Sequence, residues 1–245
     1  MPRTRESQTN ALPLSGLTVL ELASVLAGPS IGMFLAELGA IVIKVENSTT
    51  SGDVTRGWRL RSEPEQGDLS AYFSSVNWGK LSLAVDLRTD EGQRIIHALA
   101  ASADIVIASY KPGDAEKLHV DYPTLSAINP ALIYAHITGY GLENMRAGYD
   151  GLIQAESGFM YMNGEPDGPP TKMPVALMDL MAAHQAKEGI LLALLARQKE
   201  PVGQYVHVSL LQAAAASLAN QATNWLVGGE MPERMGSDHP NIVPY

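Results

Sequence analysis

The sequence contains no cysteine, and this absence excludes several kinds of site. A disulfide, a thiolate metal ligand and a cysteine nucleophile all require that side chain. Basic charge is also scarce: 17 Lys and Arg stand against 26 Asp and Glu, which gives a formal net charge of −9. Because binding to nucleic acid depends on clustered Lys and Arg, we expect no nucleic-acid partner.

The sequence also lacks an apolar run long enough to span a bilayer, and its N-terminus, MPRTRESQTN, has no apolar stretch of the kind found in secretory signals. We therefore expect no membrane association and a cytoplasmic location, with which the absence of cysteine agrees. The motifs GxGxxG, GxxxxGK[ST], GxSxG and HExxH are absent. The six histidines show no ligand spacing, so no metal site is expected.

The chain does contain a regular alternation of apolar strand patterns with helix patterns. Its 245 residues, 46% of them hydrophobic, can build a substantial core. Near-continuous apolar strands are typical of a parallel sheet covered on both faces. We therefore predict an α/β fold, a doubly wound, Rossmann-like parallel sheet of six strands. The strands are expected at 17–22, 40–46, 77–87, 104–109, 132–141 and 205–210, and the main helices at 27–38, 91–101, 179–198 and 211–226.

Ligands of doubly wound folds bind at the carboxyl ends of the strands. This rule nominates the loops 24–28, 109–113 and 138–141 as parts of a binding site. Lys80, Lys111 and Lys117 fall near predicted strand ends, where their cations could meet a phosphorylated ligand; each could equally be a solvated lysine.

Asp179 follows a turn-rich segment and precedes apolar residues at helical spacing, so a helix is predicted to begin at or next to it. Amide N–H groups and the helix dipole at a helix entrance favour an ionised carboxylate, the form that a nucleophile or base requires. Aspartate is also a preferred N-cap, so a purely structural role stays open. His184 would lie a little over one turn beyond Asp179, as either a base partner or an ordinary surface histidine.

Several stretches together resemble the class III coenzyme A transferase family, also called the CaiB/BaiF family. They occur in the family's order along nearly the whole chain. They are LSGLTVLELASVLAGPSIGMFLAELGAIVIKVE at 14–46, SGDVTRGW at 51–58, NWGKLSLAVDL at 77–87, YKPGDAEKL at 110–118, INPALIYAHITGYG at 128–141, GYDGLIQAESGFM at 148–160, GPPTKMPVALMDL at 168–180 and HPNIVPY at 239–245.

The resemblance implies an acyl-CoA:carboxylate CoA-transferase in which Asp179 is the catalytic aspartate. Its carboxylate would attack the acyl-CoA thioester to give a mixed anhydride and CoA thiolate, and the thiolate would then form an aspartyl-CoA thioester. The acceptor carboxylate would attack in turn, and CoA would finally return to the new acid. CoA is thus a substrate, and no permanently bound cofactor is expected.

The resemblance also places contacts to the substrates. Leu26 stands where formyl-CoA transferases carry a glutamine, which argues against formyl-CoA and oxalate specificity, and Asn47 stands where many relatives carry a phosphate-binding arginine. Contacts to the acyl-CoA or the acid are implied for Tyr149 and Asp150. Contacts to CoA are implied for Val25, Ala27, Asn77, Lys80, Tyr110, Lys117 and Tyr140.

Two alternatives remain open. The family includes α-methylacyl-CoA racemases, but Tyr149 stands where those enzymes have a histidine base, and a phenol with a pKa near ~10 is a poor base at neutral pH. The N-terminal residues show no pattern, so a flexible arm is expected at 1–12, followed by the CoA-binding large domain at 13–228. Family members are also longer than this chain, which implies that residues 229–245 are the start of a linker to a small domain that this chain lacks. The chain would then be a homodimer, assemble with a chain that supplies the missing half, or serve as a non-catalytic CoA-binding subunit.

Overall fold

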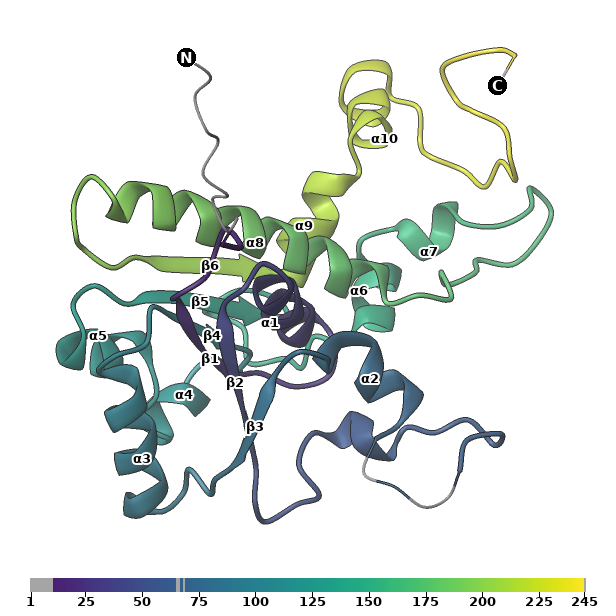
Figure 1. Ribbon diagram of the computed structural model, residues 1–245. Coiled ribbons are helices and arrows are strands. Elements are labelled where there is room, and N and C mark those ends of the chain that lie inside the picture. The colour runs from purple at the N-terminus through teal and green to yellow at the C-terminus, as the bar shows by residue number, and fades with distance from the viewer. Residues whose placement is uncertain (1–10, 65–66, 68, 245) are drawn as a thin grey trace, which may run out of the picture.

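The computed structural model describes residues 11–64, 67 and 69–244 (Figure 1). Most of the arm predicted at residues 1–12 lies outside the described residues. Within them, one sheet organises the chain, and every pair of neighbouring strands in it is parallel. The predicted doubly wound α/β fold is therefore confirmed.

The sheet has six strands in the order β3-β2-β1-β4-β5-β6, so the chain starts in the middle and winds outward in both directions. The turning point lies between β1 and β4, where a doubly wound fold leaves a crevice for ligands. The strands are β1 (Thr18–Leu22), β2 (Ile41–Glu46), β3 (Leu81–Ala84), β4 (Ile105–Ala108), β5 (Ile133–Thr138) and β6 (Tyr205–Ser209).

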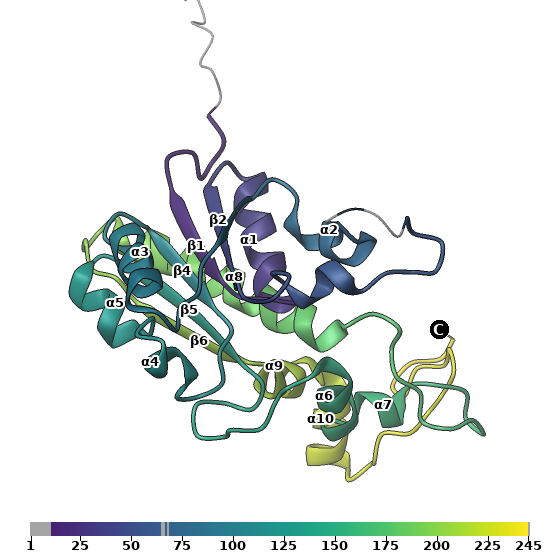
Figure 2. The same cartoon turned by 90° about the horizontal axis from the view of Figure 1, so that it is seen from below.

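Helices cover both faces of the sheet, as Figures 1 and 2 show. The buried apolar residues accordingly form two clusters, one on each face. On one face lie α1 (Ala27–Glu37), α8 (Leu177–Arg197) and α9 (Leu210–Ser217). On the other lie α3 (Asp90–Ala100), α4 (Asp114–Lys117) and α5 (Tyr122–Ile128).

The central strands are largely apolar because both of their faces are buried. All four residues of β4 and all six of β5 are buried, and both strands contribute to both clusters. The long helix α8 packs against β5, β6, α1 and α9. This packing places the first turn of α8, which carries Asp179, near the carboxyl ends of the central strands.

Short helices that the periodicity did not predict connect these elements. Each has too few residues for an amphipathic pattern to stand out. They are η1 (Val54–Gly57), a 3₁₀ turn, α2 (Ala71–Asn77), α6 (Asp150–Glu156) and α7 (Phe159–Met162).

The continuous helix predicted at 211–226 is wrong. The chain forms α9, then α10 (Asn220–Thr223), and then the π-helical turn η2 (Asn224–Gly228). Ala219 lies between α9 and α10 with φ +46°, a backbone conformation that a right-handed α-helix does not contain. From this break onward the chain extends away from the sheet (Figure 1).

None of the helices in the described part of the chain is long and apolar enough to cross a membrane.

Candidate active site

A pocket of about 460 Å³ lies at the carboxyl ends of the central strands. It is lined by the loop after β1, the loop after β4 and the end of β5, the three places that the sequence nominated. The three loops thus line one pocket, and the binding of a ligand there stays a prediction. Predicted site residues among its lining are Val25, Ala27, Tyr110, Tyr149, Asp150 and Asp179.

Asp179 lies in the first turn of α8 rather than at its cap. The helix begins at Leu177, and its N-cap is Ala176, whose side chain makes no capping hydrogen bond. The carboxylate that serves the helix entrance instead belongs to Asp150: its Oδ1 accepts the backbone N–H of Met178 at 2.7 Å and that of Asp179 at 3.4 Å. Asp150 therefore occupies the position favourable to negative charge.

Asp150 is itself held from both sides. The amide Nε2 of the fully buried Gln154 donates to Asp150 Oδ2 at 2.6 Å, and Gln154 Oε1 accepts the backbone N–H of Met173 at 2.8 Å. These bonds join α6 to the segment that leads into α8. The two carboxyl groups of Asp150 and Asp179 consequently face the same pocket on two elements fixed to each other.

This arrangement changes the acidity of Asp179. Burial raises the pKa of its carboxyl group, the negative charge of Asp150 raises it further, and the result is about 7. The prediction that the helix entrance favours the ionised form of Asp179 is wrong, because Asp150 takes up the amide groups there. His184, considered as a base partner, is exposed and is not among the residues that line the pocket.

An aromatic wall faces the same space. Trp58 and Tyr72 line the pocket, with their ring centroids 5.0 Å apart in an edge-on contact. Burial and then the charges of Asp179, Asp150 and Asp53 raise the pKa of Tyr72, so its phenol stays neutral. Sequence reasoning did not single out either ring as a site residue, although Trp58 closes the stretch SGDVTRGW.

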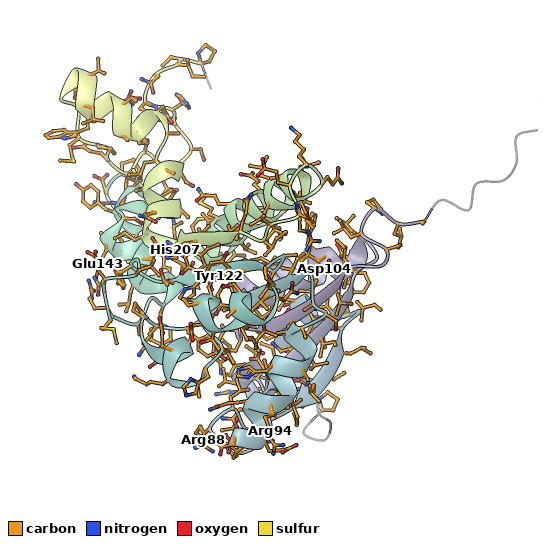
Figure 3. All side chains as sticks on the ribbon, turned by 90° about the vertical axis from the view of Figure 1, so that its left-hand side faces the viewer. Arg88, Arg94, Asp104, Tyr122, Glu143 and His207 are labelled. Carbon is orange, nitrogen blue, oxygen red and sulfur yellow. The ribbon has the colours of Figure 1, made fainter. Side chains whose placement is uncertain are left out.

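A second pocket of about 400 Å³ adjoins the first. Ser24, Ser109 and Tyr110 line both, so the two form neighbouring compartments at the carboxyl ends of the strands. Burial raises the pKa of Tyr110 to about 12. The second pocket also contains Arg88, labelled in Figure 3, which the sequence analysis did not single out.

Lys80 and Asn77 do not line either pocket. The Lys80 side chain is 2% exposed, its Nζ lies 2.7 Å from Glu21 Oε2, and it donates to Asn77 Oδ1 at 2.9 Å. Burial lowers the pKa of Lys80 to about 8, although the charge of Glu21 opposes this. A phosphate would have to displace a buried carboxylate to reach this ammonium, and contact with CoA at Lys80 and Asn77 stays a prediction.

The remaining predicted contacts lie outside the two pockets or at their rim. Lys117 is exposed and pairs with Asp114 at 2.9 Å. The guanidinium carbon of Arg146 lies 4.2 Å from the ring centroid of Tyr140. Arg146 in turn lines the first pocket. Tyr149 lines the same pocket and is 70% exposed. Contacts of Lys117 and Tyr140 with CoA, and of Tyr149 and Asp150 with substrate, stay predictions.

Within residues 11–64, 67 and 69–244, no group of three or more His, Asp or Glu side chains is arranged to hold a metal ion.

The fold and the pocket define a doubly wound α/β protein with a pair of carboxyl groups in a pocket at its strand ends. The family model for CoA-transferase family III matches residues 14–245. The chain belongs to this family.

Relatives of known name are similar over nearly the whole chain. A succinate–glutarate CoA-transferase of Agrobacterium fabrum is 43% identical over 239 residues, which cover 95% of this chain and 60% of the relative. A succinyl-CoA:glutarate CoA-transferase of Homo sapiens is 38% identical over 246 residues, 99% of this chain and 55% of the relative. The chain thus spans little more than half the length of these relatives.

A crystal structure of a CaiB/BaiF family protein from Brucella suis matches the fold. Its TM-score is 0.87 at 44% sequence identity, with 96% of this chain and 63% of that chain covered. The agreement extends over the sheet and the helices that position the pocket.

Proposed function

We propose that this chain carries the acyl-transfer site of an acyl-CoA:carboxylate CoA-transferase, with Asp179 as the nucleophile. The observation that supports this most directly is the carboxyl group of Asp179 in the first turn of α8, facing a pocket large enough for an acyl-thioester end. Family membership supplies the reaction class, because relatives of this chain are named as CoA-transferases.

The raised pKa of Asp179 suits a nucleophile. A carboxylate of pKa about 7 is a stronger nucleophile than one of ordinary acidity, yet about half of it is ionised at neutral pH. Its oxygen would form a bond to the thioester carbonyl carbon, and the C–S bond would break with the electron pair leaving on the CoA sulfur. The thiolate would then attack the aspartyl carbonyl of the mixed anhydride and release the donor acid as a carboxylate.

The second half of the exchange reverses the first with another acid. The acceptor carboxylate would attack the aspartyl-CoA thioester, and the thiolate would attack the acyl carbonyl of the new anhydride. This returns the Asp179 carboxylate and releases the new acyl-CoA, so no proton, oxidant or metal ion is consumed.

CoA would extend across both pockets. We place the thioester end in the first pocket beside Asp179 and the nucleotide end in the second, where Arg88, which pairs with Asp86 at 2.9 Å but keeps 65% of its side chain exposed, offers a cation for phosphate. Tyr110 lines both compartments and is a candidate contact to the pantetheine arm. Since the chain covers little more than half of its relatives, we further propose that a second copy or another chain completes the enzyme.

The test traps the covalent intermediate. The purified protein is incubated with succinyl-CoA, treated with hydroxylamine and digested, and the peptide that contains Asp179 is examined by mass spectrometry. We expect a hydroxamate on Asp179 in the wild type and none in Asp179→Asn. Asp167→Asn, which alters an exposed carboxylate outside the pocket, is the matched control and should label like the wild type.

Two results would contradict the proposal: labelling at another residue, or CoA exchange by Asp179→Asn at the wild-type rate. Binding of CoA without any adduct would instead support a non-catalytic CoA-binding subunit. Exchange of the α-proton of an acyl-CoA in deuterated solvent would support a racemase.

A further inference from the structure

The backbone of Val25 is held in a strained conformation at the wall of the first pocket. Its φ is +72°, in the left-handed region that β-branched residues rarely adopt. Val25 lies in the loop between β1 and α1, and residues 24–27 of that loop line the pocket. Such strain persists only where the surrounding structure enforces it, and it is concentrated at functional sites.

The backbone of Val25 is hydrogen-bonded to the side chain of Asp53. Its Oδ2 and Oδ1 accept the backbone N–H of Val25 at 3.2 and 3.4 Å. The same carboxylate accepts the backbone N–H of Thr55 at 3.0 Å and its hydroxyl at 2.8 Å, which fixes Asp53 at the start of η1. The Asp53 side chain is 1% exposed, so water does not compete for these bonds.

Asp53 belongs to a buried cluster of four charges, Glu21, Lys44, Asp53 and Lys80, whose side chains are at most 2% exposed. Lys44 Nζ lies 3.0 Å from Glu21 Oε1 and 2.9 Å from Asp53 Oδ2, and Lys80 Nζ lies 2.7 Å from Glu21 Oε2. Two positive and two negative charges balance. Burying four charges is expensive, and well-packed apolar residues could often stabilise a fold equally well.

This charge cluster holds the loop at three points of its backbone. Lys44 Nζ donates to the carbonyl of Ala23 at 2.9 Å, before the strained residue. Asp53 accepts the N–H of Val25 itself. Lys80 Nζ donates to the carbonyl of Pro29 at 2.8 Å, in the first turn of α1. The entry, the middle and the exit of the loop are thus all tied to the same four side chains.

We propose that Asp53 is a positioning residue for the CoA site: with the charge cluster behind it, its carboxylate keeps Val25 in the left-handed conformation and so sets the pocket wall formed by residues 24–27. Asp53 lines the second pocket and is not among the residues that line the first, which contains Asp179. The inference rests on the proposed function insofar as the positioned wall is the one that receives CoA.

The test combines Asp53→Asn with Val25→Gly. Asparagine keeps the size of the side chain but removes the charge that Lys44 pairs with and weakens the bond to the Val25 N–H. Glycine adopts a positive φ without strain, so a loop with Val25→Gly needs less help from Asp53. The interaction between the two positions is then measured as a double-mutant cycle.

The first measurement uses the unliganded 245-residue protein and does not depend on its function. Amide exchange and amide chemical shifts are recorded by NMR. In Asp53→Asn we expect the Val25 amide to exchange at least about tenfold faster and the Leu26 and Ala27 shifts to move, while the amides of β1 keep their protection. Unchanged exchange and shifts in this loop would overturn the inference.

The second measurement is the affinity for CoA by calorimetry in four proteins: wild type, each single variant and the double variant. We expect Asp53→Asn to weaken binding about tenfold when Val25 is present and less than about threefold in the Val25→Gly background. An equal loss in both backgrounds would overturn the inference, because Asp53 would then act independently of the strained residue.

Asp104→Asn is the matched control. Asp104, labelled in Figure 3, also accepts a backbone N–H, that of Thr18 at 2.9 Å, and pairs with Arg197 at 2.8 Å, but it precedes β4 and lines neither pocket. It should lower stability without changing CoA affinity or the amides of residues 24–27. A third outcome separates the two proposals. If none of the four proteins binds CoA but the Val25 amide still exchanges faster in Asp53→Asn, the proposed CoA site is wrong and Asp53 still positions the loop.

Discussion

At the scale of single residues, the carboxyl pair of Asp150 and Asp179 determines how this site responds to pH. The pKa of Asp179 is raised to about 7 by burial and by the charge of Asp150. The carboxylate of Asp150 accepts hydrogen bonds from the N–H of Met178 and from the side-chain amide of Gln154. Asp150 is thus bonded at the entrance of α8, and its charge makes the carboxyl group of Asp179 less acidic.

The first prediction at this scale concerns the pH profile. In the proposed mechanism only the ionised form of Asp179 attacks, so the rate of its acylation by succinyl-CoA should rise about tenfold between pH 6 and pH 8, with a midpoint near 7. In Asp150→Asn the negative charge is gone, so the pKa of Asp179 should fall and the midpoint should move to lower pH. The measurement is the initial rate of adduct formation from pH 5 to pH 9.

Asparagine at position 150 can still accept the N–H of Met178, so the start of α8 should remain intact. Asp167→Asn, an exposed site, serves as the control and should leave the midpoint unchanged. A midpoint that stays near 7 in Asp150→Asn would show that burial alone raises the pKa of Asp179.

At the scale of elements, the pocket depends on a close approach between two backbones. A Cβ on Gly148 would lie 2.1 Å from the Cα of Gly139, and a Cβ on Gly139 would lie 2.4 Å from the Cα of Gly148. The end of β5 and the start of α6 can therefore touch only because both residues are glycine. This contact places Asp150 two residues further along, where it caps α8.

The prediction at this scale is that Gly148→Ala separates the two segments. We expect a loss of about 1–3 kcal/mol in the free energy of unfolding, as for overpacked sites, and at least a tenfold loss in the acylation rate of Asp179. Urea titration and adduct kinetics measure the two effects. Gly151→Ala is the control, since its Cβ would meet only the flexible side chain of Lys172 at 3.4 Å; equal effects of both variants would refute the close-approach explanation.

The chain after α9 differs from the predicted helix and does not pack on the sheet. The predicted helix at 211–226 breaks at Ala219, and the part after the break carries exposed apolar side chains instead of a packed face. Trp225 is 49% exposed, Leu226 77% and Val227 88%. Helix propensity predicted one continuous helix here. Within the described chain, however, these apolar side chains are not buried as those of a core helix are.

At the scale of the whole molecule, that segment borders a nearly apolar pocket of about 400 Å³ lined by the turn between α6 and α7, by α7 and by the chain after α9. A contiguous exposed apolar surface of this kind is characteristic of an interface. We refer to the exposed residues Trp225, Leu226, Val227 and Met231 as the C-terminal apolar patch.

The prediction at this scale is that the patch makes the chain self-associate. Sedimentation velocity should show a concentration-dependent oligomer, and replacing Leu226 and Val227 by lysine should weaken the association at least about tenfold, because two exposed apolar side chains would become charged. Leu60→Lys, at an exposed leucine far along the chain from the patch, is the control. A wild-type protein that stays monomeric at every concentration would contradict the prediction.

Much of this fold could be predicted from the sequence, because the pattern of residues close together in the chain indicates strands and helices. The apolar runs of β1, β2, β4 and β5 and the helical spacing of α1, α3 and α8 predicted their elements to within a few residues. The short helices α2, α6 and α7 were missed because periodicity over so few residues carries little signal. The alternation of the long elements was sufficient to predict a parallel sheet, and hence a site at its carboxyl edge.

The sequence by itself determined the doubly wound fold, the family, and the placement of Asp179 near a helix start at the site. Only the tertiary structure decided the chemistry of particular side chains. Asp150 of α6 lies near Asp179, and its charge raises the pKa of that carboxyl group. Glu21 forms an ion pair with the buried Lys80, and Asp53 accepts the N–H of Val25. Periodicity is a property of adjacent residues, whereas a charge state or an ion pair depends on groups that meet only after the chain has folded.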